Sequence, residues 1–216
     1  MLCNAAGYST QCVAELAIGL TIACLRNMPD CETAVRTGGV GGALRGREIG
    51  GCTVGIVGTG AIGTMTARLF QAFGAKVIAY SRTVRPEVEE MGISYVSLET
   101  LMAQSDIVSL HLPSNPQTKG MISRAMLQKM KPTAILINVA RGAVVDNTAL
   151  AEALNQEKIA GAGIDVFGTA PSGNVSSFEG KTHRSNPSCG LCHRGKYASA
   201  CGDCVPECGG LPGRVS

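Results

Sequence analysis

Residues Thr53–Gly63, with the sequence TVGIVGTGAIG, decide the expected fold of this chain. The first five residues form a short apolar run typical of a buried strand, and the pattern Gly58-x-Gly60-x-x-Gly63 follows directly. Apolar residues at helical spacing continue to Phe73, after which Gly74 is placed to end a helix. A strand, a glycine-rich turn and a helix in this order predict a phosphate-binding turn for a dinucleotide.

Each glycine of the turn has its own physical role in this interpretation. Gly58 permits the tight turn, Gly60 lets the backbone approach a pyrophosphate, and Gly63 lets the helix and the strand pack closely. Ala61 and Ile62 lie in the first helical turn, where unpaired amides and the positive end of the helix dipole face the phosphates. A glycine turn that serves packing alone is the alternative.

Further apolar runs alternate with helical patterns on both sides of this turn. They predict strands at Lys76–Tyr80, Ser94–Val96, Ile107–His111, Ala134–Asn138 and Ala160–Val166. Helices are expected at Val13–Leu25, which Pro29 closes, at Leu98–Gln104, from a Ser123 cap to Met130, and from an Asp146 cap through Leu154. Strict alternation predicts an α/β fold, a doubly wound parallel sheet that is Rossmann-like, with helices on both faces.

The second strand ends without an acidic residue, which leaves the choice of dinucleotide open. A carboxylate at this position would hold the ribose 2′-hydroxyl of NAD. The sequence instead continues Tyr80-Ser81-Arg82-Thr83, and an arginine can pair with the 2′-phosphate of NADP. A solvated Arg82 with main-chain contacts to the ribose is the other interpretation, so both NAD and NADP are expected cofactors.

Composition excludes several other classes of function. A net charge of +3 without a basic stripe, and 4% aromatic residues, disfavour a nucleic-acid partner. The longest apolar run, Val13–Leu25, contains Glu15 and is too short to span a bilayer, so no membrane association is expected. It also lacks the features of a signal peptide, which predicts a cytoplasmic protein.

Composition also changes along the chain near Gly168. Residues 168–216 contain nine Gly and four Pro but only six Leu, Ile, Val or Phe, which is typical of a segment that does not order by itself. We therefore expect a dinucleotide-binding domain over residues 1–167 and an irregular, disordered Cys- and Gly-rich tail over residues 168–216.

Several separate motifs accompany the glycine turn in a fixed order. They are NAAGYST at 4–10, VAE at 13–15, SLHLP at 109–113, TKG at 118–120, INVARG at 137–142, VVD at 144–146 and GIDVF at 163–167. Together they resemble the NAD-binding domain of the D-isomer-specific 2-hydroxyacid dehydrogenases, the group of phosphoglycerate dehydrogenase and glyoxylate/hydroxypyruvate reductase. The resemblance covers residues 3–167 and implies hydride transfer between a nicotinamide cofactor and a 2-oxo acid or D-2-hydroxy acid.

The resemblance also implies roles for single residues. Arg141 matches the catalytic arginine that holds the substrate carboxylate and polarises the 2-oxo group, a role that suits a permanently charged double donor. Asp165 matches the residue that meets the nicotinamide carboxamide. Cofactor-lining positions are matched by His111, Leu112, Pro113, Thr118, Val139 and Ala140. A surface ion pair for Arg141 and a hydrogen-bonded strand-end histidine for His111 are the structural alternatives.

Two departures from the family pattern put the activity of this chain in doubt. The family's substrate-binding domain is expected to be missing except for its crossover helix, at about residues 13–28, through which a homodimer is expected. After Phe167 the chain has Ala170 where the family has a glutamate, and no Pro-His pair follows. That histidine is the general acid of the family. A dinucleotide-sensing module of the corepressor type, which uses the fold for partner choice, is the alternative function.

The tail contains two Cys-x-x-Cys pairs, Cys189/Cys192 and Cys201/Cys204. They suggest a zinc site, and Cys192-His193 also matches a c-type haem attachment site, but eight residues between the pairs is shorter than usual for zinc. Reading codons permitted for residues 184–197 one nucleotide later gives VLTPHVGFATEESM, which resembles the family's own stretch with its Pro-His pair. A change of reading frame after about residue 168 is therefore expected, and a zinc site or an unstructured natural tail are the alternatives. No metal ligand is expected.

Overall fold

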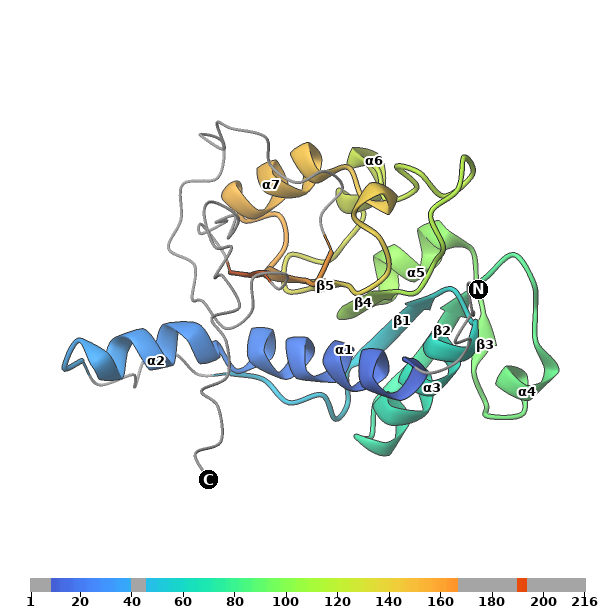
Figure 1. Cartoon of the computed structure of the whole chain (residues 1–216), viewed down its shortest axis with the longest axis horizontal. Helices are drawn as coiled ribbons and strands as arrows, with labels where there is room; N and C mark the ends of the chain where they lie inside the picture. The colour runs from blue at the N-terminus through green and yellow to red at the C-terminus, as the bar shows by residue number, and fades with distance from the viewer. Residues whose placement is uncertain (1–8, 40–45, 167–189, 194–216) are drawn as a thin grey trace, which may run out of the picture.

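The computed structural model describes residues 9–39, 46–166 and 190–193. Within these ranges one sheet has the strand order β3-β2-β1-β4-β5-β6-β7 (Figure 1). Its first six members pair in parallel and β7 pairs antiparallel with β6. The strands are β1 Thr53–Val57, β2 Lys76–Tyr80, β3 Ser94–Tyr95, β4 Ile107–Leu110, β5 Ile135–Asn138, β6 Gly161–Ile164 and β7 Gly190–His193. The predicted doubly wound parallel sheet is confirmed.

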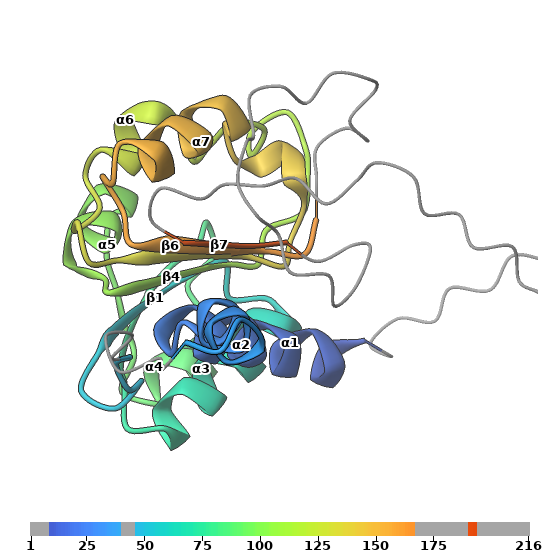
Figure 2. The ribbon, with the colours of Figure 1, turned by 90° about the vertical axis from the view of Figure 1, so that its left-hand side faces the viewer.

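Helices cover both faces of the sheet (Figure 2). On one side lie α1 Thr10–Leu25, α2 Met28–Arg36, α3 Ala61–Ala72 and α4 Pro86–Glu89; on the other lie α5 Leu98–Gln104, α6 Arg124–Leu127 and α7 Asn147–Asn155. A short 3₁₀ turn, Gly142–Val144, follows β5. Asp146 caps α7 by accepting a hydrogen bond from the Ala149 amide at 3.0 Å, as the sequence predicts.

The strands supply a core to each face because successive side chains point to opposite sides. In β5, Leu136 packs with α5 and α7, whereas Ile135 and Ile137 pack with α1 and α3. All four residues of β5 are buried. Burial on both faces explains why these strands read as continuous apolar runs in the sequence.

Two helices that the sequence does not predict have a proline in their first turn. Helix α1 ends at Leu25, as the sequence predicts, but Pro29 does not mark its end, because Pro29 lies in the first turn of α2. Asn27, with φ of +50°, separates the two helices. Pro86 likewise begins α4. A proline has no amide hydrogen to lose in a first helical turn, so it starts a helix as readily as it ends one.

Smaller differences concern the ends of elements. The helix after Ser123 stops at Leu127 instead of Met130, and the Ser123 side chain makes no capping hydrogen bond. The tail was expected to be irregular, but residues 190–193 form β7 beside β6, as an edge strand. The other residues of the tail, and with them most of the Cys-x-x-Cys positions, lie outside the described residues.

Among the described residues, no single helix has the length and apolarity to cross a membrane. Helices α1 and α2 have the required length and apolarity only when they are counted together, and they are bent by 56° relative to each other.

Candidate functional site

The carboxyl ends of five parallel strands lie in one register row. Tyr80 of β2 lies opposite Val57 of β1, Val57 opposite Leu110 of β4, Leu110 opposite Asn138 of β5, and Asn138 opposite Ile164 of β6. The residue that follows each strand end is a predicted site residue: Ser81, Gly58, His111, Val139 and Asp165. The fold therefore brings these five positions to one edge of the sheet, where doubly wound folds bind their ligands.

The glycine-rich turn leaves β1 at the centre of this row. Gly58 has φ of +98°, and a Cβ there would lie 2.7 Å from the carbonyl oxygen of His111. A Cβ on Gly63 would lie 1.9 Å from the carbonyl oxygen of Gly58, so only glycine permits this approach of helix to strand. A Cβ on Gly60 would meet nothing within 4 Å. The first and third glycines thus serve the turn itself, and the second faces open space.

The amino terminus of α3 is free to bind an anion. Gly60 occupies the N-cap position, and no side chain caps the helix. Ala61 is exposed, Ile62 is half-buried, and no acidic residue lies in the first turn. Amides at such a terminus favour a phosphate because they point along the helix axis at its positive end. The open cradle at Gly60 and this uncapped terminus fit the diphosphate of a dinucleotide.

Arg141 lies in a turn whose backbone is hydrogen-bonded to the side chain of Asn138. The buried Asn138 side chain donates from Nδ2 to the Arg141 carbonyl at 3.2 Å and accepts from the Ala140 amide at 3.1 Å. The Arg141 guanidinium is exposed and donates to the Ala140 carbonyl at 2.6 Å. In the described part of the chain, no carboxylate lies within ion-pair distance of it. The surface ion pair considered from the sequence is therefore not formed with these residues.

His111 lies directly behind the glycine turn. Its Cβ is 3.3 Å from the position of a Cβ on Gly63, and its Nε2 shares a hydrogen bond with Ser109 Oγ at 2.9 Å. Nδ1 is buried and has no hydrogen-bond partner among the described residues. Burial lowers the pKa of the imidazole to about 4, so His111 is neutral near pH 7. A neutral ring at this position packs behind the turn and carries no charge toward a ligand.

Hydrogen bonds of the Thr118 side chain fix the conformation of the loop that follows His111. The Thr118 hydroxyl donates to the Pro113 carbonyl at 2.6 Å and accepts from the Asn115 amide at 3.0 Å. Thr118 is buried, so in this structure the hydroxyl serves the loop. Leu112 is half-buried, and its Cδ2 lies 2.9 Å from a Cβ placed on Gly58, whereas Pro113 is exposed.

The remaining predicted site residues follow the carboxyl ends of β2, β5 and β6. Ser81 is half-buried and Arg82 is exposed after β2. Val139 and Ala140 are buried after β5. Asp165 is half-buried after β6, its amide donates to the Asn138 carbonyl at 3.0 Å, and burial raises the pKa of its carboxyl.

Sequence reasoning missed two residues that organise the site. The sequence pattern places Asn138 at the end of a strand, and an asparagine at that position is itself a signal for side-chain to backbone bonding. Tyr95 was not singled out, yet its hydroxyl donates to Thr59 Oγ1 in the glycine turn at 2.9 Å. No sequence signal indicates that contact, because the two residues are 36 positions apart. Among the described residues no group of three or more His, Cys, Asp or Glu could hold a metal ion.

Comparisons with known proteins agree with this geometry. Residues 18–186 match the family described as "D-isomer specific 2-hydroxyacid dehydrogenase, NAD binding domain", a match that extends past the composition change at Gly168. Glyoxylate reductase of Thermococcus litoralis is 43% identical over 189 residues, which cover 82% of this chain and 56% of the relative. D-3-phosphoglycerate dehydrogenase of Mycobacterium tuberculosis is 39% identical over 181 residues, covering 83% of this chain and 34% of the relative.

Solved structures agree as well. The NAD-complexed D-isomer specific 2-hydroxyacid dehydrogenase of Lactobacillus delbrueckii ssp. bulgaricus has a TM-score of 0.71 and 38% identity, covering 78% of this chain and 52% of that protein. The chain spans about half the length of this protein and of the glyoxylate reductase, and about a third of the phosphoglycerate dehydrogenase. By sequence, fold and the arrangement of its strand ends, the chain belongs to the D-isomer specific 2-hydroxyacid dehydrogenase family and carries that family's NAD-binding domain.

Proposed function

We propose that this chain holds a nicotinamide dinucleotide with its diphosphate against the Gly58–Gly63 turn. The observation that carries the proposal is the contrast within the turn. Gly63 has no room for a Cβ, because the Gly58 carbonyl oxygen is 1.9 Å away, whereas Gly60 faces open space beside an uncapped helix terminus. Packing alone explains the glycine at position 63 and leaves the glycine at position 60 unexplained.

The residues after the other strand ends then line the rest of the coenzyme. In this proposal Ser81 and Arg82 hold the adenosine ribose, and Asp165 meets the nicotinamide carboxamide. Between them lie the cofactor-lining residues His111, Leu112, Pro113, Val139 and Ala140, and Thr118 acts by ordering the loop that carries Pro113.

Arg141 is the proposed substrate-binding residue. When bound, the coenzyme exchanges a hydride with C2 of a 2-oxo acid or D-2-hydroxy acid. The guanidinium offers two parallel donors to the acid's carboxylate, and its fixed charge stabilises negative charge on the neighbouring oxygen. Asn138 fixes the backbone on both sides of Arg141, which keeps the guanidinium at the carboxyl edge of the sheet. The glyoxylate reductase and hydroxypyruvate reductase relatives support this substrate class.

Reduction of a 2-oxo acid also requires a general acid that protonates its 2-oxo oxygen. The sequence has no such residue at the position where the family has one. Ala170 occupies the position of the family's glutamate, and no Pro-His pair follows it. We therefore propose coenzyme binding with little or no turnover. The test is a spectrophotometric assay with NADH and NADPH and with glyoxylate, pyruvate or hydroxypyruvate, beside a direct titration of each coenzyme. Binding without oxidation supports the proposal; steady 2-oxo acid reduction contradicts it.

The proposed change of reading frame has its own test. Sequencing the coding DNA across residues 168–197 is expected to show, one nucleotide later, codons for the Pro-His stretch. Codons that do not spell this stretch exclude the change of frame. A fold that depends on one equivalent of zinc would support the alternative zinc site.

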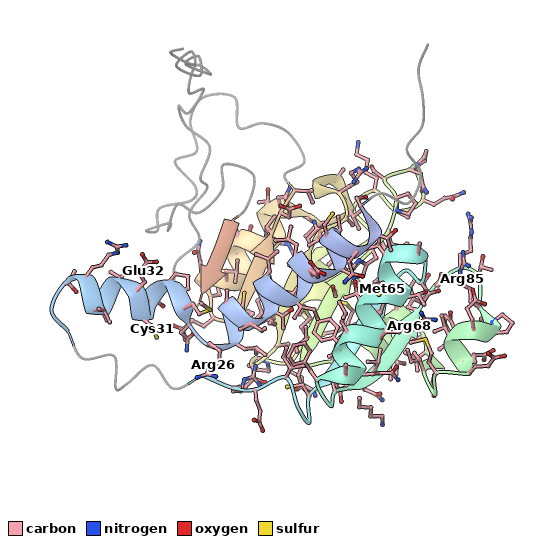
Figure 3. All side chains as sticks on the ribbon, turned by 60° about the horizontal axis from the view of Figure 1, so that its bottom comes forward. Arg26, Cys31, Glu32, Met65, Arg68 and Arg85 are labelled. Atoms are coloured by element: carbon pink, nitrogen blue, oxygen red, sulfur yellow. The ribbon has the colours of Figure 1, made fainter. Side chains whose placement is uncertain are left out.

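We further propose a homodimer through α1 and α2. Helix α2 extends away from the sheet (Figure 3), has no buried residue, and exposes 52% of Met28 and 73% of Val35. These two exposed apolar side chains on one helix are the observation that supports an interface between protein chains. Sedimentation is expected to show a dimer that Val35→Glu weakens, and a monomer of the unaltered chain contradicts the proposal.

A cytoplasmic location is also part of the proposal. Cys12, Cys31 and Cys52 form no disulfide within the described part of the chain, which supports a reducing compartment. Cell fractionation tests this location directly.

A further inference from the structure

The segment Pro113–Ile122 connects β4 to α6 (Figure 1), and its second half is hydrogen-bonded to the turn that follows Arg141. The Gly120 amide donates to the Ala143 carbonyl at 2.8 Å, and the amide of the last residue of the segment donates to the Val144 carbonyl at 3.0 Å. Both acceptors lie in the short 3₁₀ turn directly after Arg141. The segment therefore begins at a proposed cofactor-lining residue and ends against the turn that carries the proposed substrate-binding residue.

Ile122 makes further contacts with the residues that follow this turn. Its carbonyl accepts from the Asp146 amide at 3.0 Å, and Ile122 and Val145 form a parallel β-bridge. Ile122 is fully buried, so these bonds are shielded from water. The backbone around Arg141 thus has two separate supports, which are the Asn138 side chain before it and the end of this segment after it.

Thr118 ties the first half of the segment to the second half. Its hydroxyl donates to the Pro113 carbonyl at 2.6 Å and accepts from the Asn115 amide at 3.0 Å. The Asn115 side-chain oxygen accepts in turn from the Gln117 amide at 2.9 Å and from the Thr118 amide at 3.0 Å. Thr118 lies two residues before Gly120, so one buried hydroxyl fixes the distance between Pro113 and the bonds to the Arg141 turn.

The geometry of the hydroxyl shows how Thr118 acts. A hydroxyl has one hydrogen to donate, and the Pro113 carbonyl takes it. Removing the hydroxyl leaves the Pro113 carbonyl and the Asn115 amide without this partner inside a compact loop. The conformation of the whole segment then becomes less well defined, at the Pro113 end and at the Gly120 end alike.

We infer that Thr118 is a positioning residue for both ligand positions of the site, because it sets Pro113 at the coenzyme position and, through Gly120 and Ile122, the turn that carries Arg141. The inference rests on the proposed function and adds a physical link between its coenzyme position and its substrate position.

The first experiment needs no ligand. Amide hydrogen exchange of the purified 216-residue protein is followed by mass spectrometry, because exchange reports local opening of the backbone. Thr118→Val keeps the shape of the side chain and removes the hydroxyl. Exchange is expected to rise about fivefold in residues 113–122 and also in residues 139–146. Thr118→Ser restores the hydroxyl, so exchange in both ranges is expected to stay within about twofold of the unaltered chain.

Ser97→Ala is the matched control. The Ser97 side chain caps α5 by accepting from the Thr100 amide at 3.1 Å, so this variant also loses a structural hydroxyl. Exchange in residues 139–146 is expected to stay within about twofold of the unaltered chain. An equal rise in Ser97→Ala and Thr118→Val shows a general loss of stability and overturns the positioning role.

The second experiment measures the two ligand positions. The chain is titrated with NADH and NADPH, and then with oxamate, a 2-oxo acid analogue, in the presence of the coenzyme that binds more tightly. Thr118→Val is expected to weaken both the coenzyme and oxamate about fivefold, and Thr118→Ser is expected to restore both. A loss in Thr118→Ser as large as in Thr118→Val shows that the hydroxyl is not the cause and overturns the inference.

The outcomes separate this inference from the function on which it rests. A rise in exchange that is confined to residues 113–122 in Thr118→Val, or unchanged affinity for both ligands, overturns the link and leaves the dinucleotide site standing. Binding of neither coenzyme by the folded, unaltered chain overturns the dinucleotide site, and with it the role given to Thr118. Coenzyme binding without oxamate binding in the unaltered chain overturns the substrate half of the inference.

Discussion

Gly63 and Gly58 approach so closely that a Cβ on Gly63 would lie 1.9 Å from the Gly58 carbonyl oxygen. No rotation of a side chain relieves this contact, because the Cβ is fixed by the backbone and the oxygen belongs to the turn. Gly63→Ala is therefore expected to cost about 3 kcal/mol or more in the free energy of unfolding. Urea denaturation followed by circular dichroism measures it, and a loss below about 1 kcal/mol would show that the turn gives way easily.

Asn138 holds the turn that carries Arg141, and Asn138→Ala is the next prediction. The substitution removes two hydrogen bonds and leaves the buried Ala140 amide unpaired. We expect a loss of about 1–3 kcal/mol in the free energy of unfolding. Arg141→Ala is the control, because the side chain is exposed and its removal is expected to change stability by less than about 0.5 kcal/mol. Equal losses in both variants would contradict the role given to Asn138.

His111 predicts a loss of stability on mild acidification. Burial lowers the pKa of its imidazole from 6.5 to about 4. The unfolded chain therefore takes up a proton below about pH 6.5, and the folded chain does so only near pH 4. Stability is expected to fall by about 3 kcal/mol over this window. His111→Gln is expected to remove most of this pH dependence of the free energy of unfolding. An NMR titration that gives His111 an ordinary pKa would contradict the prediction.

Asp106 predicts a second loss in a lower pH window. Burial alone raises the pKa of the Asp106 carboxyl, but hydrogen bonds from Lys131 Nζ and the Thr53 amide, each 2.9 Å, outweigh it and hold the pKa below its ordinary value. The stabilisation is present above the ordinary pKa and is lost as pH falls through the folded pKa. Asp106→Asn is expected to cost about 1 kcal/mol at pH 7, since Lys131 is partly exposed, and less below about pH 4. A cost that does not depend on pH would contradict the ion pair.

The sequence predicts the sheet well because its strands are buried on both faces. In β1, β4 and β5 almost every residue is buried, so apolar runs mark the strands within one residue at each end. The glycine pattern likewise predicts the turn, since Gly58 and Gly63 are required by local backbone geometry.

Other features depend on information that local patterns do not carry. Pro29 and Pro86 lie in the first turns of helices, and a proline alone does not indicate whether a helix begins or ends there. The contact of Tyr95 with Thr59 joins residues 36 positions apart and exists only because β3 pairs with β2. The hydrogen bond from the Thr118 hydroxyl to the Pro113 carbonyl depends on the conformation of a six-residue loop, and the place of Thr118 along the cofactor stays a prediction.

Titration of Gly60→Ala with both coenzymes, beside the unaltered chain, tests the proposed dinucleotide site most directly. The new Cβ meets no protein atom within 4 Å, and φ of −69° suits alanine, so stability is expected to change by less than about 1 kcal/mol. The same Cβ occupies the space proposed for the diphosphate, so coenzyme affinity is expected to fall about tenfold or more. Undiminished coenzyme binding by a folded Gly60→Ala variant would contradict a diphosphate at this turn.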